Sequence, residues 1–170
     1  MTATFRPNVL DFEASGFGVT SYPIEVGAVL SSGQKYCTLI QPATHWKHWD
    51  PQAQEVHGVT PVDLHKHGKP VHTVAQELND FLAKQTLYSD GWVVDKPWLL
   101  TLFYQAGLQP NFYLSPLELI LKEEQMAIWA QTKQTVMNEL ALSRHRASSD
   151  ALIIQETYVR SLQAASNDIS

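Results

Sequence analysis

The chain has 170 residues, which suits one domain with a buried core, and 44% of them are hydrophobic, which argues against disorder. Seventeen acidic residues against twelve basic ones give a net charge of −5, so a protein that grips long duplex DNA through a basic face is not expected. No apolar run is long enough to span a membrane, no signal peptide is recognisable, and the single cysteine, Cys37, excludes an internal disulfide. We therefore expect a cytoplasmic protein without a membrane segment.

The N-terminal part has the pattern of strands separated by turns. One apolar strand ends at residues 11–13, a second spans residues 24–30, and a third spans residues 35–40. Between the last two, Ser32-Gly33 predicts a hairpin turn. These residues are therefore expected to form three neighbouring strands.

Two short helices are predicted by matching start and stop signals. Asp50-Pro51 is an N-cap followed by proline in the first turn, and Gly58 is the stop. Thr60-Pro61 and Gly68 repeat this arrangement. A longer amphipathic helix is predicted over residues 71–82 from the spacing of its apolar side chains.

The second half of the chain alternates strands and helices. The pattern predicts a strand over residues 86–89, a helix over 95–104, a short strand over 112–114 and helical structure over 116–142. Together with the first three strands, this order predicts an α/β fold with a mixed five-stranded sheet and helices on both faces.

A final helix is predicted over about residues 149–162, and Ser148 or Ser149 is a natural N-cap for it. The polar residues 164–170 are expected to form a frayed tail. One domain is therefore expected to cover residues 1–163.

Asp11 and Glu13 lie two residues apart at the end of the first strand. Side chains at this spacing in a strand point to the same face. Two carboxylates so close repel each other unless a cation lies between them, and Mg²⁺ and Mn²⁺ prefer oxygen ligands. An isolated pair at this spacing is more often two solvated charges, so the pattern alone gives only a candidate metal site.

The segment that follows the pair, residues 14–18, is small and glycine-rich except for Phe17. Its glycines would let the backbone approach a ligand, and Phe17 is suited to stack on a nucleic-acid base. A hairpin tip would use the same glycines for turning alone. Both interpretations remain open.

A second group of polar residues lies near the C-terminus, where His145 precedes a helix and Asp150 falls in its first turn. Alone, Asp150 is explained as a partner of the helix dipole and His145 as a surface residue. Together they supply a general base and another metal carboxylate. Arg144 and Arg146 flank the histidine, either as solvated side chains or in contact with phosphate.

In their order and spacing, these segments resemble the three motifs of the DEDDh, or DnaQ-like, 3′–5′ exonucleases. The residues that match the motifs are Asp11, Glu13, Asp95, His145 and Asp150. The segment at residues 55–60, which contains His57-Gly58-Val59-Thr60, resembles the HG(I/V)T segment of that family. The resemblance covers about residues 8–160.

The resemblance implies a ribonuclease H-like fold and the release of 5′-mononucleotides from 3′ ends of single-stranded or frayed DNA or RNA. It implies two Mg²⁺ or Mn²⁺ ions, with His145 as general base for the attacking water. Imidazole suits that role because it titrates near neutral pH. The metal ligands that the resemblance implies are Asp11, Glu13, Asp95 and Asp150. Ala14, Phe17 and His57 occupy positions where relatives contact the terminal nucleotide.

The chain departs from the family at Ser89-Asp90-Gly91, where His-Asn-x is usual before the second-motif aspartate. Asp90 either joins the metal site or caps a turn, and we expect the turn. The preference between DNA and RNA depends on contacts to the 2′-hydroxyl, so the sequence leaves it open. Some members of the family pair as homodimers, and the oligomeric state of this chain is open as well.

Other patterns in the sequence carry weaker hypotheses. The pairs His45/His48 and His65/His67 lack the cysteine or third ligand that a structural zinc site needs. Glu25, in an otherwise apolar strand, is a candidate for a buried ion pair. The alternative function is a non-catalytic nucleic-acid-binding or polymerase-associated accessory domain that keeps the fold. The presence of all four carboxylates favours catalysis.

Overall fold

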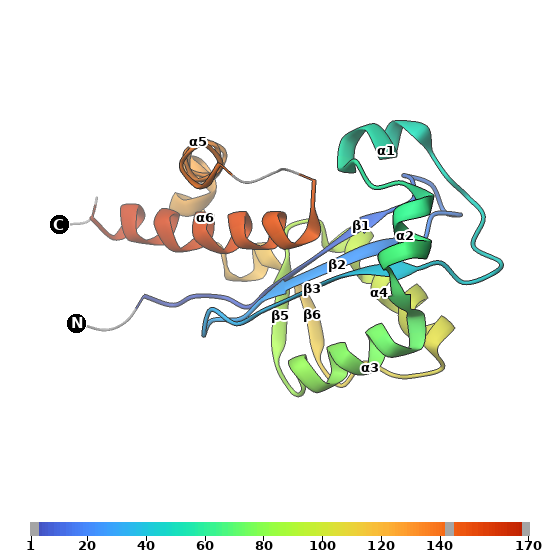
Figure 1. The fold of residues 1–170 in the computed structure, drawn as a ribbon. Coiled ribbons are helices and arrows are strands. Elements are labelled where there is room, and N and C mark those ends of the chain that lie inside the picture. Colours follow the sequence, from blue (N-terminus) through green and yellow to red (C-terminus); the bar gives the residue numbers. More distant parts are fainter. Residues whose placement is uncertain (1–3, 142–144, 168–170) are drawn as a thin grey trace.

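A mixed sheet forms the centre of the computed structural model, which describes residues 4–141 and 145–167. Within those residues six strands are present: β1 (Val9–Ala14), β2 (Pro23–Val29), β3 (Lys35–Gln41), β4 (Lys69–Pro70), β5 (Thr86–Ser89) and β6 (Tyr113–Pro116). Their order across the sheet is β4-β3-β2-β1-β5-β6 (Figure 1). The strand β1 is antiparallel to β2 and parallel to β5, so it lies in the middle of the sheet.

The sheet has one strand more than the five predicted. The additional strand, β4, has two residues, one of which is a proline. A segment so short leaves no alternating pattern in the sequence, which is why it was not predicted.

Helices cover both faces of the sheet, as predicted (Figure 1). In chain order they are α1 (Pro51–His57), α2 (Pro61–His67), α3 (Val71–Leu82), α4 (Trp92–Ala106), the 3₁₀ helix η1 (Leu117–Ile120), α5 (Glu123–Leu140) and α6 (Ala147–Asn167). The helices α5 and α6 lie on one face, and α3 and α4 lie on the other (Figure 1). No helix among the described residues combines the length and apolar composition needed to cross a membrane.

The two faces of β1 have different neighbours. Leu10 and Phe12 belong to the core that β1 shares with α3 and α4. Val9 belongs to a second core that includes residues of α6. Because side chains alternate along a strand, Asp11 and Glu13 share the face of Val9. The two acidic side chains therefore continue the α6 side of the sheet beyond its apolar core.

The short helices α1 and α2 begin and end as predicted from local signals. The Asp50 side chain accepts a hydrogen bond from the Gln52 amide at 2.8 Å, and Gly58 has a left-handed φ of 71°. At α2, the side chain of Thr60 and that of Asp63 form a reciprocal capping box.

The last helix differs from its prediction at both ends. It begins at Ala147, so Ser148 and Ser149 lie inside the first turn and neither is the N-cap. The Ala147 amide instead donates to the Glu25 carboxylate of β2 at 3.2 Å. A cap supplied by a distant strand leaves no local signal in the sequence. At its other end the helix continues to Asn167, beyond the predicted end near residue 162.

Candidate active site

The first two candidate ligands lie on the central strand β1, opposite β2. Asp11 pairs with Gly27 and Glu13 pairs with Glu25 across the antiparallel register. Like charges directly opposite each other destabilise a strand pair, so the Glu13–Glu25 pairing needs compensation. Arg146, just before α6, and the amide of Ala147 at the start of that helix provide it.

Glu25 is completely buried and forms an ion pair with Arg146, just before α6. Arg146 donates from Nη2 to Glu25 Oε1 at 2.9 Å and from Nε to Oε2 at 3.0 Å. The hypothesis that Glu25 belongs to a buried ion pair is thus confirmed, with Arg146 as its partner. Arg144, the other arginine beside His145, lies outside the described residues.

Gly27 allows the start of α6 to approach the backbone of β2. A Cβ atom at this position would lie 2.4 Å from the carbonyl carbon of Ala147, closer than two such atoms can come. The missing side chain and the Glu25–Arg146 pair therefore act together. They place Asp150, in the first turn of α6, over the acidic face of β1.

Asp11, Glu13 and Asp150 form one compact group. Each of them offers a carboxylate oxygen, and these oxygens all lie within 4.8 Å of one another. Asp11 Oδ2 is buried and has no hydrogen-bond partner among the described residues. A buried carboxylate oxygen without a donor is unfavourable unless a cation or proton satisfies it. The donor set, three carboxylates, is the chemistry that a hard divalent cation prefers.

Burial and mutual repulsion raise the pKa values of this group. Burial raises the pKa of Asp11 well above its ordinary value, and the charges of Asp95 and Glu13 raise it further. Burial, followed by the charges of Asp150 and Glu25, raises the pKa of Glu13 to about 8. Without a cation, the site therefore holds protons at neutral pH. A divalent ion would replace them and relieve the repulsion.

Asp95 lies in the first turn of α4 and is buried, but it is not in the group of three. Its Oδ1 accepts a hydrogen bond from the Phe12 amide at 3.3 Å, and its Oδ2 accepts one from the Ser89 hydroxyl. Burial raises its pKa to about 7, and the charge of Asp90 adds to the rise. Asp95 is thus held against β1, next to the group but with both oxygens already engaged.

His145 lies immediately before α6, half-buried, with a left-handed φ of 60°. This conformation is unfavourable for a residue with a side chain, and such residues are frequent at functional sites. Burial raises the pKa of Asp150, and the charge of His145 opposes that rise. His145 therefore lies in the segment that leads into α6, the helix whose first turn carries Asp150.

The three predicted substrate contacts differ in exposure. Ala14 is the last residue of β1 and is buried, whereas Phe17 in the following loop is 72% exposed. His57 is buried, and its Nδ1 accepts a hydrogen bond from the Val59 amide at 3.1 Å. The Asp50 amide donates to the Ser15 carbonyl at 2.9 Å, which ties the start of α1 to the loop after β1.

Asp90 lies in the turn after β5, but the hydroxyl that accepts from the Gly91 amide in this turn is that of Ser89, and Asp90 has a partner that the sequence does not indicate. Its carboxylate lies 3.0 Å from the ammonium of Lys133 on α5. The two residues are separated by 43 positions in the chain. No motif connects them, so only the structure identifies the pair.

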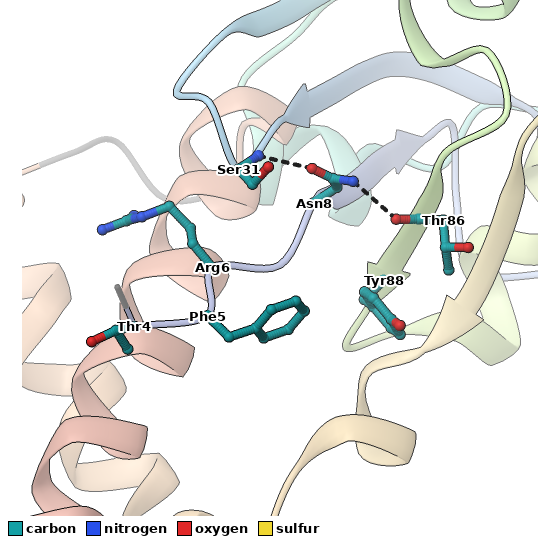
Figure 2. A pocket seen from close by; sticks show the side chains of 7 residues that line it. All are labelled: Thr4, Phe5, Arg6, Asn8, Ser31, Thr86 and Tyr88. Carbon is teal, nitrogen blue, oxygen red and sulfur yellow. Dashed lines mark hydrogen bonds between the residues drawn. The ribbon is translucent and has the colours of Figure 1, made fainter. Parts of the chain in front are cut away.

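A separate pocket of about 540 Å³ lies at the other end of β1 (Figure 2). It is lined by Thr4, Phe5, Arg6, Asn8, Ser31, Thr86 and Tyr88. Asn8 accepts a hydrogen bond from the Ser31 amide at 2.8 Å and donates one to the Thr86 carbonyl at 3.1 Å (Figure 2). None of the candidate catalytic residues lines this pocket, and Asn8 has a structural role in joining the segments around it.

Solved structures of E. coli exonuclease I are similar to this chain in fold. The complex with a dA16 oligonucleotide aligns with a TM-score of 0.65 at 14% sequence identity, over 94% of this chain and 42% of exonuclease I. The zinc-bound form of its complex with single-stranded DNA aligns with a TM-score of 0.66 at 15% identity, over the same shares of the two chains. The complex with a 5cy-dT13 oligonucleotide gives a TM-score of 0.66 at 14% identity.

This chain thus spans less than half the length of the exonuclease I chains that it matches. No protein-family model and no curated protein sequence matches it. At such low identity the similarity shows the fold, which is ribonuclease H-like as the sequence predicted.

Proposed function

We propose that the chain is a metal-dependent 3′–5′ exonuclease that releases 5′-mononucleotides from single-stranded or frayed nucleic-acid ends. The observation that carries this proposal is the group formed by Asp11, Glu13 and Asp150, with its buried and unpartnered Asp11 oxygen. Carboxylates in such a group are costly to the fold unless they bind a cation. The similarity in fold to exonuclease I supports the same reaction.

Four carboxylates would hold two divalent ions, Mg²⁺ or Mn²⁺. When bound, such ions stabilise the charge that develops on the oxygens of the reacting phosphate and lower the pKa of an attacking water. Asp11, Glu13 and Asp150 offer oxygens directly. Asp95, whose oxygens already accept hydrogen bonds from Phe12 and Ser89, would take part through a water.

His145 would accept the proton of the attacking water. Its position just before α6, the helix that carries Asp150, supports this role, because an imidazole there would be near the carboxylate group. The 3′-terminal nucleotide would lie between the loop after β1 and the end of α1. There the exposed ring of Phe17 would stack on the base, and Ala14 and His57 would line the contact.

A single-stranded end is the substrate that the charge distribution favours. The net charge of −5 does not favour binding of a long duplex through its phosphates, so affinity would come mainly from stacking and from the bound metals. Exonuclease I, the structural neighbour, is described in complex with oligonucleotides and with single-stranded DNA. Hydrolysis of a DNA and an RNA of the same sequence decides which of the two this chain prefers.

The test is hydrolysis of a single-stranded DNA and an RNA of the same sequence, each labelled at its 5′ end in one sample and its 3′ end in another. With Mg²⁺ or Mn²⁺, we expect immediate release of labelled mononucleotide from the 3′ end and stepwise shortening of the 5′-labelled strand. Asp11→Asn protein and excess chelator are the controls, and both should abolish the reaction.

Internal cleavage of the 5′-labelled strand would contradict an exonuclease. If neither polymer is shortened with either metal but the oligonucleotides still bind, as measured by fluorescence anisotropy, the chain is a non-catalytic binding domain. That result would restore the accessory-domain alternative.

A further inference from the structure

The Asp90–Lys133 ion pair joins the turn after β5 to α5. Asp90 follows β5 and Lys133 lies on α5, and their side chains are 28% and 31% exposed. Lys133 is the only lysine or arginine in the sequence of α5. The single positive charge of this helix therefore points at a carboxylate next to the candidate metal centre.

Asp90 lies between two residues that approach Asp95. Ser89, just before Asp90, donates from its hydroxyl to Asp95 Oδ2, and a Cβ atom on Gly91, just after it, would lie 3.8 Å from the same oxygen. In addition, the charge of Asp90 contributes to the raised pKa values of both Asp11 and Asp95. Asp90 is thus a fifth carboxylate at the rim of a site that already holds four.

The charge of Lys133 also acts on Asp150 of α6. Its positive charge opposes the rise in the pKa of Asp150 that burial causes. The ammonium has Asp90 as its hydrogen-bonded partner at 3.0 Å, and α5, which carries Lys133, packs against α6.

We propose that Lys133 is a positioning residue that holds the Asp90 carboxylate at the rim of the metal centre and prevents it from becoming a ligand. A carboxylate without that partner would turn toward the bound cation, because a cation is the stronger attraction once the ammonium is gone. It would then add a ligand and occupy a position that the water or the substrate phosphate needs. This inference rests on the metal centre of the proposed function.

The test is a calorimetric titration of the intact protein with Mn²⁺ alone, so that it does not depend on any substrate. In Lys133→Met protein we expect Mn²⁺ to bind about tenfold more tightly, the size of effect that residues outside the ligand set commonly have. Lys133→Arg protein, which keeps the charge, should bind Mn²⁺ as the wild type does. Lys69→Met is the matched control, because it breaks an ion pair with Glu77 on α3, away from the site.

The double variant decides whether Lys133 acts through Asp90. In an Asp90→Asn background there is no carboxylate to release, so Lys133→Met should change Mn²⁺ affinity by only about twofold, the effect of one screened charge. An equal effect of Lys133→Met in both backgrounds, or none in the wild type, would overturn the positioning role. Thermal unfolding of each variant verifies that it is folded.

The outcomes also separate this inference from the proposed function. Mn²⁺ binding that follows the expected pattern, without release of mononucleotides from any oligonucleotide, would refute the exonuclease and leave the role of Lys133 intact. Release of mononucleotides with no dependence of Mn²⁺ affinity on Lys133 would refute the positioning role alone. Absence of Mn²⁺ binding in the wild-type protein would refute both.

Discussion

Asp11 is the residue in which function and stability conflict most directly. It is half-buried beside other carboxylates, and its buried Oδ2 has no donor among the described residues. We predict that Asp11→Asn raises the stability of the metal-free protein by about 1 kcal/mol at alkaline pH, because a neutral amide replaces a repelled charge. The same substitution should abolish Mn²⁺ binding and nuclease activity.

Thermal unfolding with chelator present, together with the Mn²⁺ titration, measures both effects. Asp80→Asn on α3 is the control, since Asp80 is an exposed carboxylate away from the site. Its stability and its metal affinity should equal those of the wild type. Lower stability of Asp11→Asn protein, or metal binding that survives in it, would show that Asp11 is not at the centre of the site.

The role of His145 is best tested with a residue that tolerates its left-handed backbone conformation. Its φ of 60° is tolerated better by asparagine than by most residues, so His145→Asn removes the imidazole with little added strain. We predict that kcat falls by about 10²- to 10⁴-fold, the usual contribution of a general base, while Mn²⁺ affinity stays within about threefold. A kcat within about tenfold of the wild type would remove His145 from the role of base.

At the scale of elements, the site depends on how closely α6 approaches β2. Gly27→Ala would place a methyl group against backbone atoms of Ala147 and Ser148, which lie 2.4 to 2.5 Å from its Cβ position. We predict a loss of about 2 kcal/mol of stability, because backbone at a helix start moves less easily than a side chain. Mn²⁺ affinity should fall as well, since Asp150 moves with the helix.

Gly18→Ala is the matched control for this prediction. A Cβ atom on Gly18 meets nothing within 4 Å, so this variant should stay within about 0.5 kcal/mol of the wild type. Urea unfolding of the two variants, followed by Mn²⁺ titration, compares them directly. Equal free energies of unfolding of the Gly27→Ala and Gly18→Ala proteins would mean that α6 can shift without loss of stability.

The same elements show what the sequence could and could not predict. The caps of α1 and α2 were predicted correctly because Asp50, Gly58 and Thr60 act on their own helices. The start of α6 was predicted wrongly because its cap, Glu25, comes from a strand more than a hundred residues earlier. A cap that acts on its own helix can be recognised from neighbouring residues in the sequence. A cap that comes from a distant strand cannot.

In the candidate site, too, some residues could be predicted from the sequence and others could not. The spacing of Asp11 and Glu13 places them on one face of a strand, and the family resemblance adds Asp150, which the structure brings to the same place. The partner of Asp90 could not be predicted, because Lys133 lies in a different helix and belongs to no motif. Candidate ligand residues can be found in the sequence because they recur in motifs. Residues that position those ligands can be found only from the tertiary structure.

At the scale of the whole molecule, the acidic centre links folding to pH. The pKa of Glu13 rises from an ordinary value of 4.5 to about 8 in the folded protein, mainly through burial. Between these two pH values the folded state binds more protons than the unfolded state. The contribution of Glu13 to stability is therefore fully present below about pH 4.5 and is lost as the pH rises through about 8.

We therefore predict that, with chelator present, the Tm falls by at least about 3 °C between about pH 6 and pH 9. Mn²⁺ should restore stability, and its effect should grow with pH, because the ion competes with protons for the same oxygens. Differential scanning calorimetry across this range, with and without Mn²⁺, measures both trends. In Glu13→Gln protein the decline of Tm with pH should be shallower, since one of the carboxylates with a raised pKa is gone. If the Tm of the metal-free wild-type protein stays constant or rises with pH, the prediction is wrong. The carboxylates would then not be protonated in the folded protein, and no cation would be needed to hold them together.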